Sequence, residues 1–388
     1  AVLPFGNLSN DPEQEYFSDG ITEDLITALS RIRRFRVAAR SSTFSYKGQS
    51  PDARLVAREM DARYVIEGSV RKAGQRIRLT VQLIDGGSGN HIWAESYDRD
   101  LDDIFALQDE LTLAIVGALE PAMGRAEQDR ARRKPPESLD AWEAYQQGIF
   151  HMNKITMDDM VRARGLFQRA ISLDPQFALA HAGKARTFFF NALLGMPEAD
   201  AAEAENAALR AVELDPDEAE AHLALGSIHH TNRESDRAIP EFEMAISLKP
   251  SYALAHHLLG SSLAHCGRSE EALPHLLAAI RLSPKDGESA PFHARIGMAY
   301  LYLRQHEEAV PWVQKAVRLP GIQWPAHCVL VAALAHLDRM DAAHKALEAL
   351  LAFRPGITVG FVRETIPTYN LDDRDHLLEG LRKAGLPE

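Results

Sequence analysis

Cysteine and long apolar runs are both scarce in this sequence of 388 residues. Its two cysteines, Cys266 and Cys328, are too few for a disulfide framework, so we expect a reducing compartment such as the cytoplasm. Zinc sites built on paired cysteines are excluded for the same reason. No segment approaches the roughly 20 apolar residues that a membrane-spanning helix requires, so we expect no membrane partner.

Positive charge is also in short supply, because 43 Lys and Arg face 55 Asp and Glu and leave a net charge of −12. Residues 1–134 carry 19 basic against 21 acidic side chains, a net of −2, whereas the remainder carries 24 against 34, a net of −10. An acidic surface repels a phosphate backbone, so we expect no nucleic acid to bind there. The chain opens with the apolar run Ala1–Phe5, without an initiating Met or a basic leader, and we expect that something upstream has been removed.

The second half of the sequence repeats itself. Leu-x-Pro or a similar ending recurs at Pro175, Pro216, Pro250, Pro284, Pro320 and Pro355, with intervals of 41, 34, 34, 36 and 35 residues. These intervals match the 34-residue period of tetratricopeptide (TPR) repeats, with one longer repeat. Proline stops a helix because it lacks the N–H group and clashes with the preceding turn.

Small residues hold the same register inside the repeats. Counted back from Pro175, Pro216, Pro250, Pro284, Gly321 and Pro355, alanine stands 12 residues earlier at positions 163, 204, 238, 272, 309 and 343, and in the first five repeats five residues earlier at positions 170, 211, 245, 279 and 316. Two antiparallel helices can approach closely at such positions. Large apolar residues lie between these alanines, at Phe167, Phe242, Leu276, Val313 and Leu347. The pattern predicts six TPR repeats over residues 144–357, after a linker at 135–143 and before a capping segment at 358–388.

The first 134 residues have the pattern of a compact α/β domain. We expect strands at Ala1–Phe5, Phe35–Ala39, Tyr64–Val70, Arg76–Ile84 and His91–Tyr97. Helices are expected after an N-cap at Ser18 or Asp19, over Asp52–Met60, and from Phe105 towards Met123. The fold class is therefore an α+β domain, a mixed sheet with three helices, followed by an all-α TPR solenoid.

Several segments carry a resemblance to a bacterial family. They are Ala1–Phe5, Asp11–Phe17, Asp19–Leu25, Tyr64–Val70, His91–Glu95, Leu101–Phe105 and Gly380–Glu388. These segments resemble the region that follows the catalytic domain in class III adenylate/guanylate cyclase-like proteins. The first domain resembles the amino-terminal domain of TolB.

This resemblance implies a cytoplasmic signalling protein whose cyclase domain precedes Ala1. It also implies a homodimer of the full-length protein, because class III catalysis needs two subunits. A minority of relatives carry a winged-helix DNA-binding domain upstream instead, so a transcription regulator remains the alternative.

Catalytic motifs are missing from the sequence. We find neither the paired metal-binding carboxylates of a class III cyclase nor a phosphate loop followed by Lys-Ser or Lys-Thr. The segment Gly86–Gly89 could cradle an anion, but we interpret it as a hairpin turn. We therefore expect a chain that is not an enzyme and holds no cofactor, while an unrecognised catalytic site is the second alternative.

Three clusters of polar residues have both a functional and a plain interpretation. Neighbouring histidines (His229, His230, His256, His257 and His265) lack the regular spacing of metal ligands, and we expect no metal site. Acidic residues at 98, 100, 102 and 103 could bind a cation, but suit a solvated loop and a helix N-terminus. Arginines at 31, 33, 34 and 36 could form a basic patch, but suit solvent-facing positions at a helix end.

The remaining candidate site is the concave groove that the first helices of TPR repeats line. Carried onto this register, the resemblance places ten residues in it: Arg186, Phe190, Ser227, His230, His257, Ser261, His265, Met298, Tyr302 and His336. Their mixture of aromatic, basic and Met side chains suits an extended peptide or a partner helix. We therefore expect a regulatory region that binds a protein partner.

Overall fold

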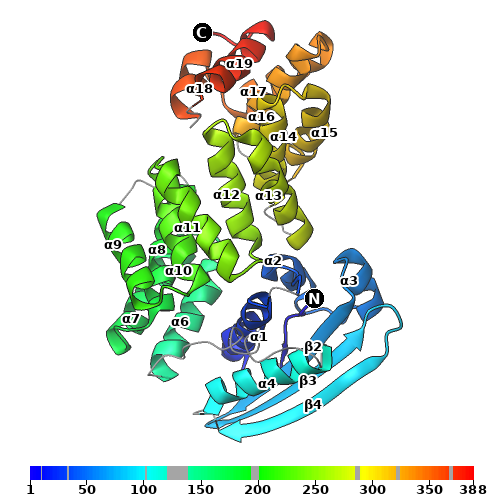
Figure 1. The fold of residues 1–388 in the computed structure, drawn as a ribbon, viewed down its shortest axis with the longest axis vertical. Helices are drawn as coiled ribbons and strands as arrows, with labels where there is room; N and C mark the ends of the chain where they lie inside the picture. The colour runs from blue at the N-terminus through cyan, green and yellow to red at the C-terminus, as the bar shows by residue number, and fades with distance from the viewer. Residues whose placement is uncertain are drawn as a thin grey trace. The chain divides into compact units, whose positions relative to one another are not determined.

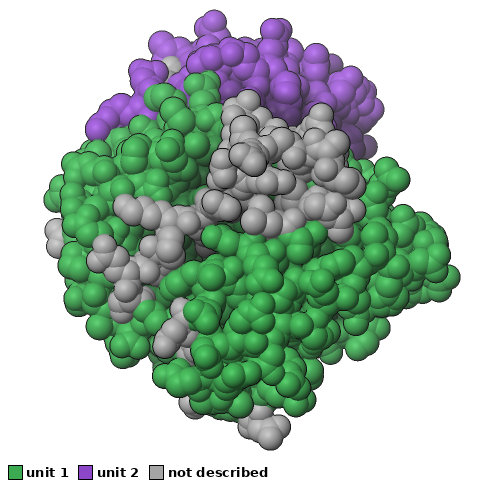
Figure 2. Space-filling view, turned by 60° about the horizontal axis from the view of Figure 1, so that its bottom comes forward, with its two compact units in different colours: residues 1–232, 240–252, 282–285 green, residues 233–239, 253–281, 286–388 purple. Residues whose placement is uncertain are grey.

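The computed structural model describes residues 1–9, 11–32, 35–100, 103–119, 139–193, 201–284, 289–319, 324–366 and 370–388. The chain forms two compact units, which Figure 2 shows in different colours. Unit 1 comprises residues 1–232, 240–252 and 282–285, and unit 2 comprises residues 233–239, 253–281 and 286–388. Within the described residues, no helix is long and apolar enough to cross a membrane.

Unit 1 begins with a four-stranded mixed sheet in the order β1-β2-β3-β4 (Figure 1). Strands β2 (Tyr64–Ala73), β3 (Arg76–Asp85) and β4 (His91–Asp100) are antiparallel neighbours, as the alternating pattern predicted. The parallel strand β1 is short, Gly6–Asn7, and the apolar run before it adds a bridge between Val2 and Ile66. The first strand was therefore expected a few residues too early.

Helices cover one face of this sheet. Besides α1 (Glu15–Ser30) and α4 (Ile104–Leu119), the domain has the short helices α2 (Arg40–Thr43) and α3 (Ala53–Glu59) and two 3-10 turns, η1 (Pro12–Gln14) and η2 (Phe44–Tyr46). The alternate residues of β3 that face α1 and α4 are fully buried: Ile77, Leu79, Val81 and Leu83. The expected cap at Ser18 or Asp19 is wrong, because Ser18 lies inside α1 and its hydroxyl donates to the Glu15 carbonyl.

The turn between β3 and β4 is stabilised by hydrogen bonds to Asp85. The Oδ1 atom of Asp85 accepts hydrogen bonds from the backbone N–H groups of Gly87 and Ser88 and from the Ser88 hydroxyl. The glycine-rich segment is therefore a hairpin turn closed by its own aspartate, as we interpreted it. The expected end of α4 near Met123 and the linker residues up to position 138 lie outside the described residues.

Twelve helices in the described residues make six antiparallel pairs after the sheet domain. Their bounds are α6 Leu139–Met152, α7 Met157–Leu173, α8 Ala178–Leu193, α9 Ala201–Leu214, α10 Ala219–Thr231, α11 Ser235–Leu248, α12 Ala253–His265, α13 Ser269–Leu282, α14 Ser289–Tyr302, α15 His306–Ala316, α16 Trp324–His336 and α17 Met340–Phe353. The pairing confirms the helical solenoid. All eleven register alanines are buried, none more than 2% exposed.

Glycines in the first helices receive the large residues of the second helices. A Cβ atom added to Gly226 would lie 2.7 Å from the ring of Phe242, and one added to Gly297 would lie 2.1 Å from Val313. Phe167 is enclosed most tightly, because Cβ atoms added to Gly148 and Gly183 would lie 2.6 and 2.7 Å from its ring. Small residues are therefore required where the helices cross.

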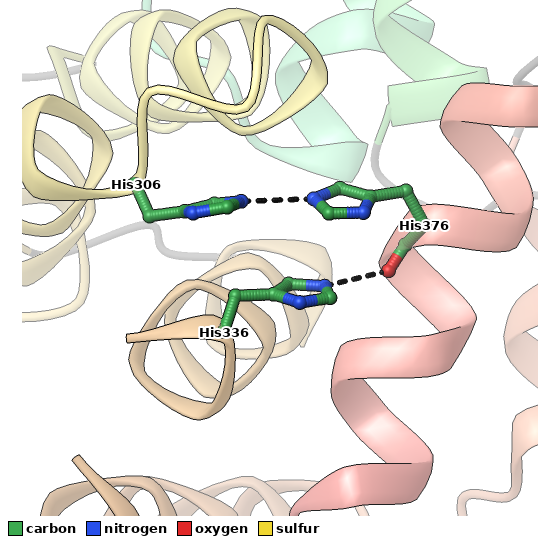
Figure 3. A group of neighbouring side chains, drawn as sticks. All are labelled: His306, His336 and His376. Carbon is green, nitrogen blue, oxygen red and sulfur yellow. Dashed lines mark hydrogen bonds between the residues drawn. The ribbon is translucent and has the colours of Figure 1, made fainter. Parts of the chain in front are cut away.

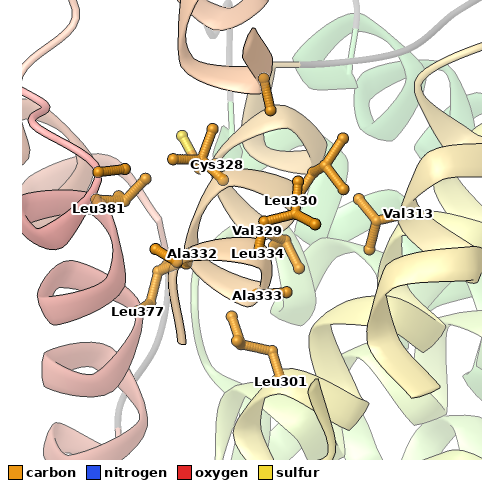
Figure 4. Close-up of a cluster of buried hydrophobic side chains, with 14 of the residues drawn as sticks. Leu301, Val313, Cys328, Val329, Leu330, Ala332, Ala333, Leu334, Leu377 and Leu381 are labelled. Carbon is orange, nitrogen blue, oxygen red and sulfur yellow. The ribbon is translucent and has the colours of Figure 1, made fainter. Parts of the chain in front are cut away.

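Two helices close the end of unit 2. α18 (Val359–Thr365) was not expected, whereas α19 (Leu371–Lys383) is the expected capping helix and ends before Gly385 at φ +91. The expected face of α19, with Leu377, Leu378 and Leu381, is buried against α16 (Figure 4). The capping helix thus covers α16, the first helix of the last repeat.

The turn between α6 and α7 contains a strained residue. Ile155 has φ +52, which a β-branched side chain adopts at a cost of roughly 1–3 kcal/mol. Because asparagine tolerates this region, we expect Ile155→Asn to raise the free energy of unfolding by about 1 kcal/mol. Urea denaturation checks this, with Ile155→Val as the control that keeps the branched side chain. Equal midpoints for the two variants would contradict the assignment of strain.

Candidate functional site

The ten predicted groove residues fall into two sets. Unit 1 contains Arg186, Phe190, Ser227 and His230, and unit 2 contains His257, Ser261, His265, Met298, Tyr302 and His336. Eight of the ten are buried or carry an ion pair that is itself largely buried, and His230 and His336 are half-buried. The two sets differ in their contacts.

Arg186 in unit 1 belongs to a buried polar network. Its guanidinium contacts the Glu220 carboxylate at 2.8 Å, and the Tyr252 hydroxyl donates to the same carboxylate. Lys249 approaches Glu220 at 3.4 Å. Burial alone would lower the pKa of Arg186, but Tyr252 and Glu220 outweigh it, so its pKa lies above the ordinary value. The Arg186 network therefore connects α8, α10 and the turn after α11.

The α/β domain packs directly beside this network. The Lys249 ammonium also donates to the Thr27 hydroxyl of α1, and Arg31 at the end of α1 forms a 2.6 Å ion pair with Glu218. Glu218 is buried and Arg31 is largely so, with side chains 4% and 13% exposed. The solvent-facing interpretation of Arg31 is therefore wrong. Arg36 pairs with Asp61 at the surface, while positions 33 and 34 lie outside the described residues.

Asp24 is the centre of the contact between α1 and the repeats. Its Oδ2 atom accepts hydrogen bonds from Gln108 of α4 at 2.9 Å, and from Gln146 and Trp142 of α6 at 3.2 and 3.4 Å. The helices approach closely here, since a Cβ atom added to Gly20 would lie 2.6 Å from Gln146. One carboxylate thus connects three helices, two from the α/β domain and one from the first repeat.

The segment expected to be the strand Phe35–Ala39 is not a strand. Its backbone instead contacts turns of the repeat array: the Val37 N–H donates to the Ser251 hydroxyl, which donates to the Phe35 carbonyl. The Ala39 N–H donates to the Leu282 carbonyl at 2.7 Å. The polar backbone groups of this segment are therefore satisfied by the repeats and not by the sheet.

Two predicted groove residues of unit 2 contact an arginine that was not among the predicted ten. Arg295 of α14 contacts the His265 Nε2 atom at 3.0 Å and the Met298 sulfur at 3.4 Å. Among the residues that the structure describes, no carboxylate lies within ion-pair distance of its guanidinium. Burial lowers the pKa of Arg295, against the influence of Tyr302. Nearby, His257 stacks on Phe292 with ring centroids 4.1 Å apart.

The other polar candidates have simple roles. Asp98 pairs with Arg76 and Arg78 across the β3–β4 ladder, and these hydrogen bonds lower the pKa of its carboxyl. Asp100 also lies on β4, not in a loop as expected, and position 102 lies outside the described residues. His229 is buried in α10, and His256 contacts His275 at 3.1 Å.

Comparison with known proteins confirms the TPR repeats and gives a family match for the first domain that was not expected. Residues 1–113 match the family model of the HilA/YgeH-like transcriptional regulator, second domain. Residues 198–253, 231–287 and 290–321 match tetratricopeptide repeat models. The TolB relation expected for the first domain is a different assignment from this match and stays a prediction.

A curated relative connects the chain to a cyclase by name. Over 244 residues the chain is 43% identical to a protein of Rhizobium meliloti (strain 1021) named "Putative adenylate cyclase 3", which covers 61% of this chain. The chain spans 41% of that relative's length.

Solved structures with a similar fold include the APC/C hetero-tetramer Cut9-Hcn1, which is 20% identical, covers 71% of this chain and 52% of that one, and has a TM-score of 0.48. Another is YrrB, described as a TPR protein with an unusual peptide-binding site, at 21% identity, 47% and 89% coverage and a TM-score of 0.33. The chain thus carries TPR repeats behind a domain that is similar to part of a transcriptional regulator.

Proposed function

We propose that this chain is the non-catalytic regulatory region of an adenylate cyclase-like signalling protein, and that its repeats bind a protein partner. The observation that carries the proposal is the contrast between the two sets of groove residues. In unit 1, Arg186 is neutralised by Glu220 beside α1, whereas in unit 2 Arg295 has only an imidazole and a thioether as described partners. The partner therefore binds at unit 2.

The chemistry around Arg295 selects a carboxylate as the group that is bound. A half-buried guanidinium without an anion carries a desolvation cost, and a carboxylate can satisfy it through two parallel hydrogen bonds. Tyr302 lies beside it, while the His265 Nε2 atom accepts a hydrogen bond from the same guanidinium. The expected partner segment is thus an acidic peptide or a chain terminus. Upstream of this region we place the cyclase domain, in a cytoplasmic dimer.

Fluorescence anisotropy with acidic peptides tests the binding site. We expect a labelled peptide that ends in Asp-Glu with a free C-terminal carboxylate to bind more tightly than a peptide in which these acidic groups are replaced by amides. Its affinity should fall as the salt concentration rises. Arg295→Met keeps the apolar stem and should reduce affinity about tenfold or more, the loss of one charged hydrogen bond. Arg281→Met, an exposed arginine on α13, is the matched control. Equal affinity of the Arg295 and Arg281 variants would contradict the assignment.

A second function is favoured by the match of residues 1–113 to part of a transcriptional regulator. In that case the same partner-binding region would serve a winged-helix DNA-binding domain. Assays of cyclic nucleotide synthesis and of DNA binding by the full-length protein separate the two. We expect the 388-residue chain alone to make no cyclic nucleotide, and synthesis by it would support the remaining alternative, an unrecognised enzyme.

A further inference from the structure

Three histidines meet at the end of unit 2, where the capping helix lies on the last repeats (Figure 3). His306 is the first residue of α15, His336 is the last residue of α16, and His376 lies in the middle of α19. One ring nitrogen from each lies within 4.8 Å of the others. All three side chains are half-buried.

The rings of His306 and His376 point at each other. Their Nε2 atoms are 2.9 Å apart, the ring centroids are 5.1 Å apart, and the planes differ by 24°. One of these nitrogens donates its N–H to the lone pair of the other, and a tautomer change in the donor ring would turn both lone pairs towards a single gap. Two imidazoles bound to tetrahedral Zn²⁺ at roughly 2.0–2.1 Å have their nitrogens about 3.3 Å apart, so a shift of a few tenths of an ångström would admit the ion.

His336 lies beneath that gap. Its ring stacks on His376 at a centroid distance of 3.9 Å and lies 4.9 Å from the ring of His306. Its Nε2 atom donates to the His376 carbonyl at 2.9 Å. Because stacked rings cannot both aim at one ion, His336 must rotate about its side-chain bonds to become the third ligand.

We propose that His306, His336 and His376 form a binding site for a divalent transition-metal ion, with Zn²⁺ as the natural occupant. Three imidazoles suit Zn²⁺ and leave its fourth position to water. The ion would tie α19 to α15 and α16, where Arg304 already pairs with Asp373 and Lys383 with Asp338. The positive charge of Arg304 is neutralised by Asp373 at 2.8 Å.

Metal titration of the 388-residue chain tests this site. After treatment with a chelator, we expect calorimetry to show one Zn²⁺ bound per chain and Co²⁺ to give the visible absorption bands of a tetrahedral complex. Each of His306→Gln, His336→Gln and His376→Gln should weaken binding by more than about tenfold, since the loss of even an outer-shell partner costs 10–100-fold. His344→Gln, at an exposed position on α17, and His275→Gln, which removes a two-histidine contact, should leave binding unchanged.

A measurement on the unmodified chain keeps the proposal testable if a variant fails to fold. Diethyl pyrocarbonate modifies accessible imidazoles, and mass spectrometry locates the products. We expect Zn²⁺ to protect His306, His336 and His376 but not His344. Absence of Zn²⁺ binding, binding that survives His376→Gln, or protection that does not include the three histidines would each overturn the site.

Discussion

Replacement of Asp24 by alanine is expected to lower the free energy of unfolding of unit 1 by about 2–4 kcal/mol. The carboxylate is buried, 5% exposed, and accepts hydrogen bonds from Gln108, Trp142 and Gln146. Alanine leaves these donors without their acceptor in a site that is closed to water, and each such loss costs about 1–3 kcal/mol. The cost falls on the contact between the α/β domain and the first repeat.

Two measurements distinguish this local effect from general instability. Urea denaturation gives the loss in the free energy of unfolding. Relative to the unmodified chain, hydrogen exchange in the variant should accelerate more in α1 and α6 than in α16 and α19. Glu243→Ala removes an exposed acidic side chain from α11 and is the matched control. If Asp24→Ala and Glu243→Ala have equal midpoints, Asp24 does not hold the domain to the repeats.

The elements that the sequence predicts well are those whose reason is local. The 34-residue period, the paired alanines and the alternation in Arg76–Ile84 each describe contacts between neighbouring segments, and the corresponding helices and strands are present. Periodicity also predicted that Leu377, Leu378 and Leu381 share one buried face of the capping helix. Such patterns can be seen in the sequence because the same kind of residue recurs at the period of the helix or strand that contains it.

The contacts between the α/β domain and the repeats have no such pattern. Asp24 meets Trp142 and Gln146 across 118 and 122 residues, and Arg31 meets Glu218 across 187. An apolar run such as Phe35–Ala39 looks like a strand because its alternate residues are apolar, yet its hydrogen bonds go to Ser251 and Leu282. The identity of a distant partner is set by the packing of the whole unit.

The candidate site was likewise predicted only in part from the sequence. The repeat register placed His265, Met298 and Tyr302 together, but passed over Arg295, which contacts two of them. Its signal was available, since an arginine three residues before Met298 lies on the same face of the helix. Of the three clustered histidines in unit 2, only His336 was predicted, as a groove residue. The sequence does not group them, because positions 306, 336 and 376 have no common spacing and the last lies beyond the repeats.

Replacement of Phe167 by alanine is expected to lower the free energy of unfolding by about 3–5 kcal/mol. The ring is fully buried and packs on Gly148 of α6, on Gly183 of α8 and beside Tyr145, 5.8 Å between centroids. Because backbone lies on both sides, the surrounding helices cannot move in to fill the space. Val161→Ala, which shortens an exposed side chain on the same helix, should change the urea midpoint little.

A double-mutant cycle tests whether the glycines exist to admit this ring. Gly183→Ala alone should destabilise the chain, because its methyl group would lie 2.7 Å from the Phe167 ring. Phe167→Leu alone should also destabilise it, through lost apolar contact. In the double variant the smaller leucine leaves room for the methyl group, so the combined loss should fall below the sum by about 0.5–3 kcal/mol, the range for residues in contact. If the two losses of unfolding free energy simply add, glycine at position 183 is not required to make room for the Phe167 ring.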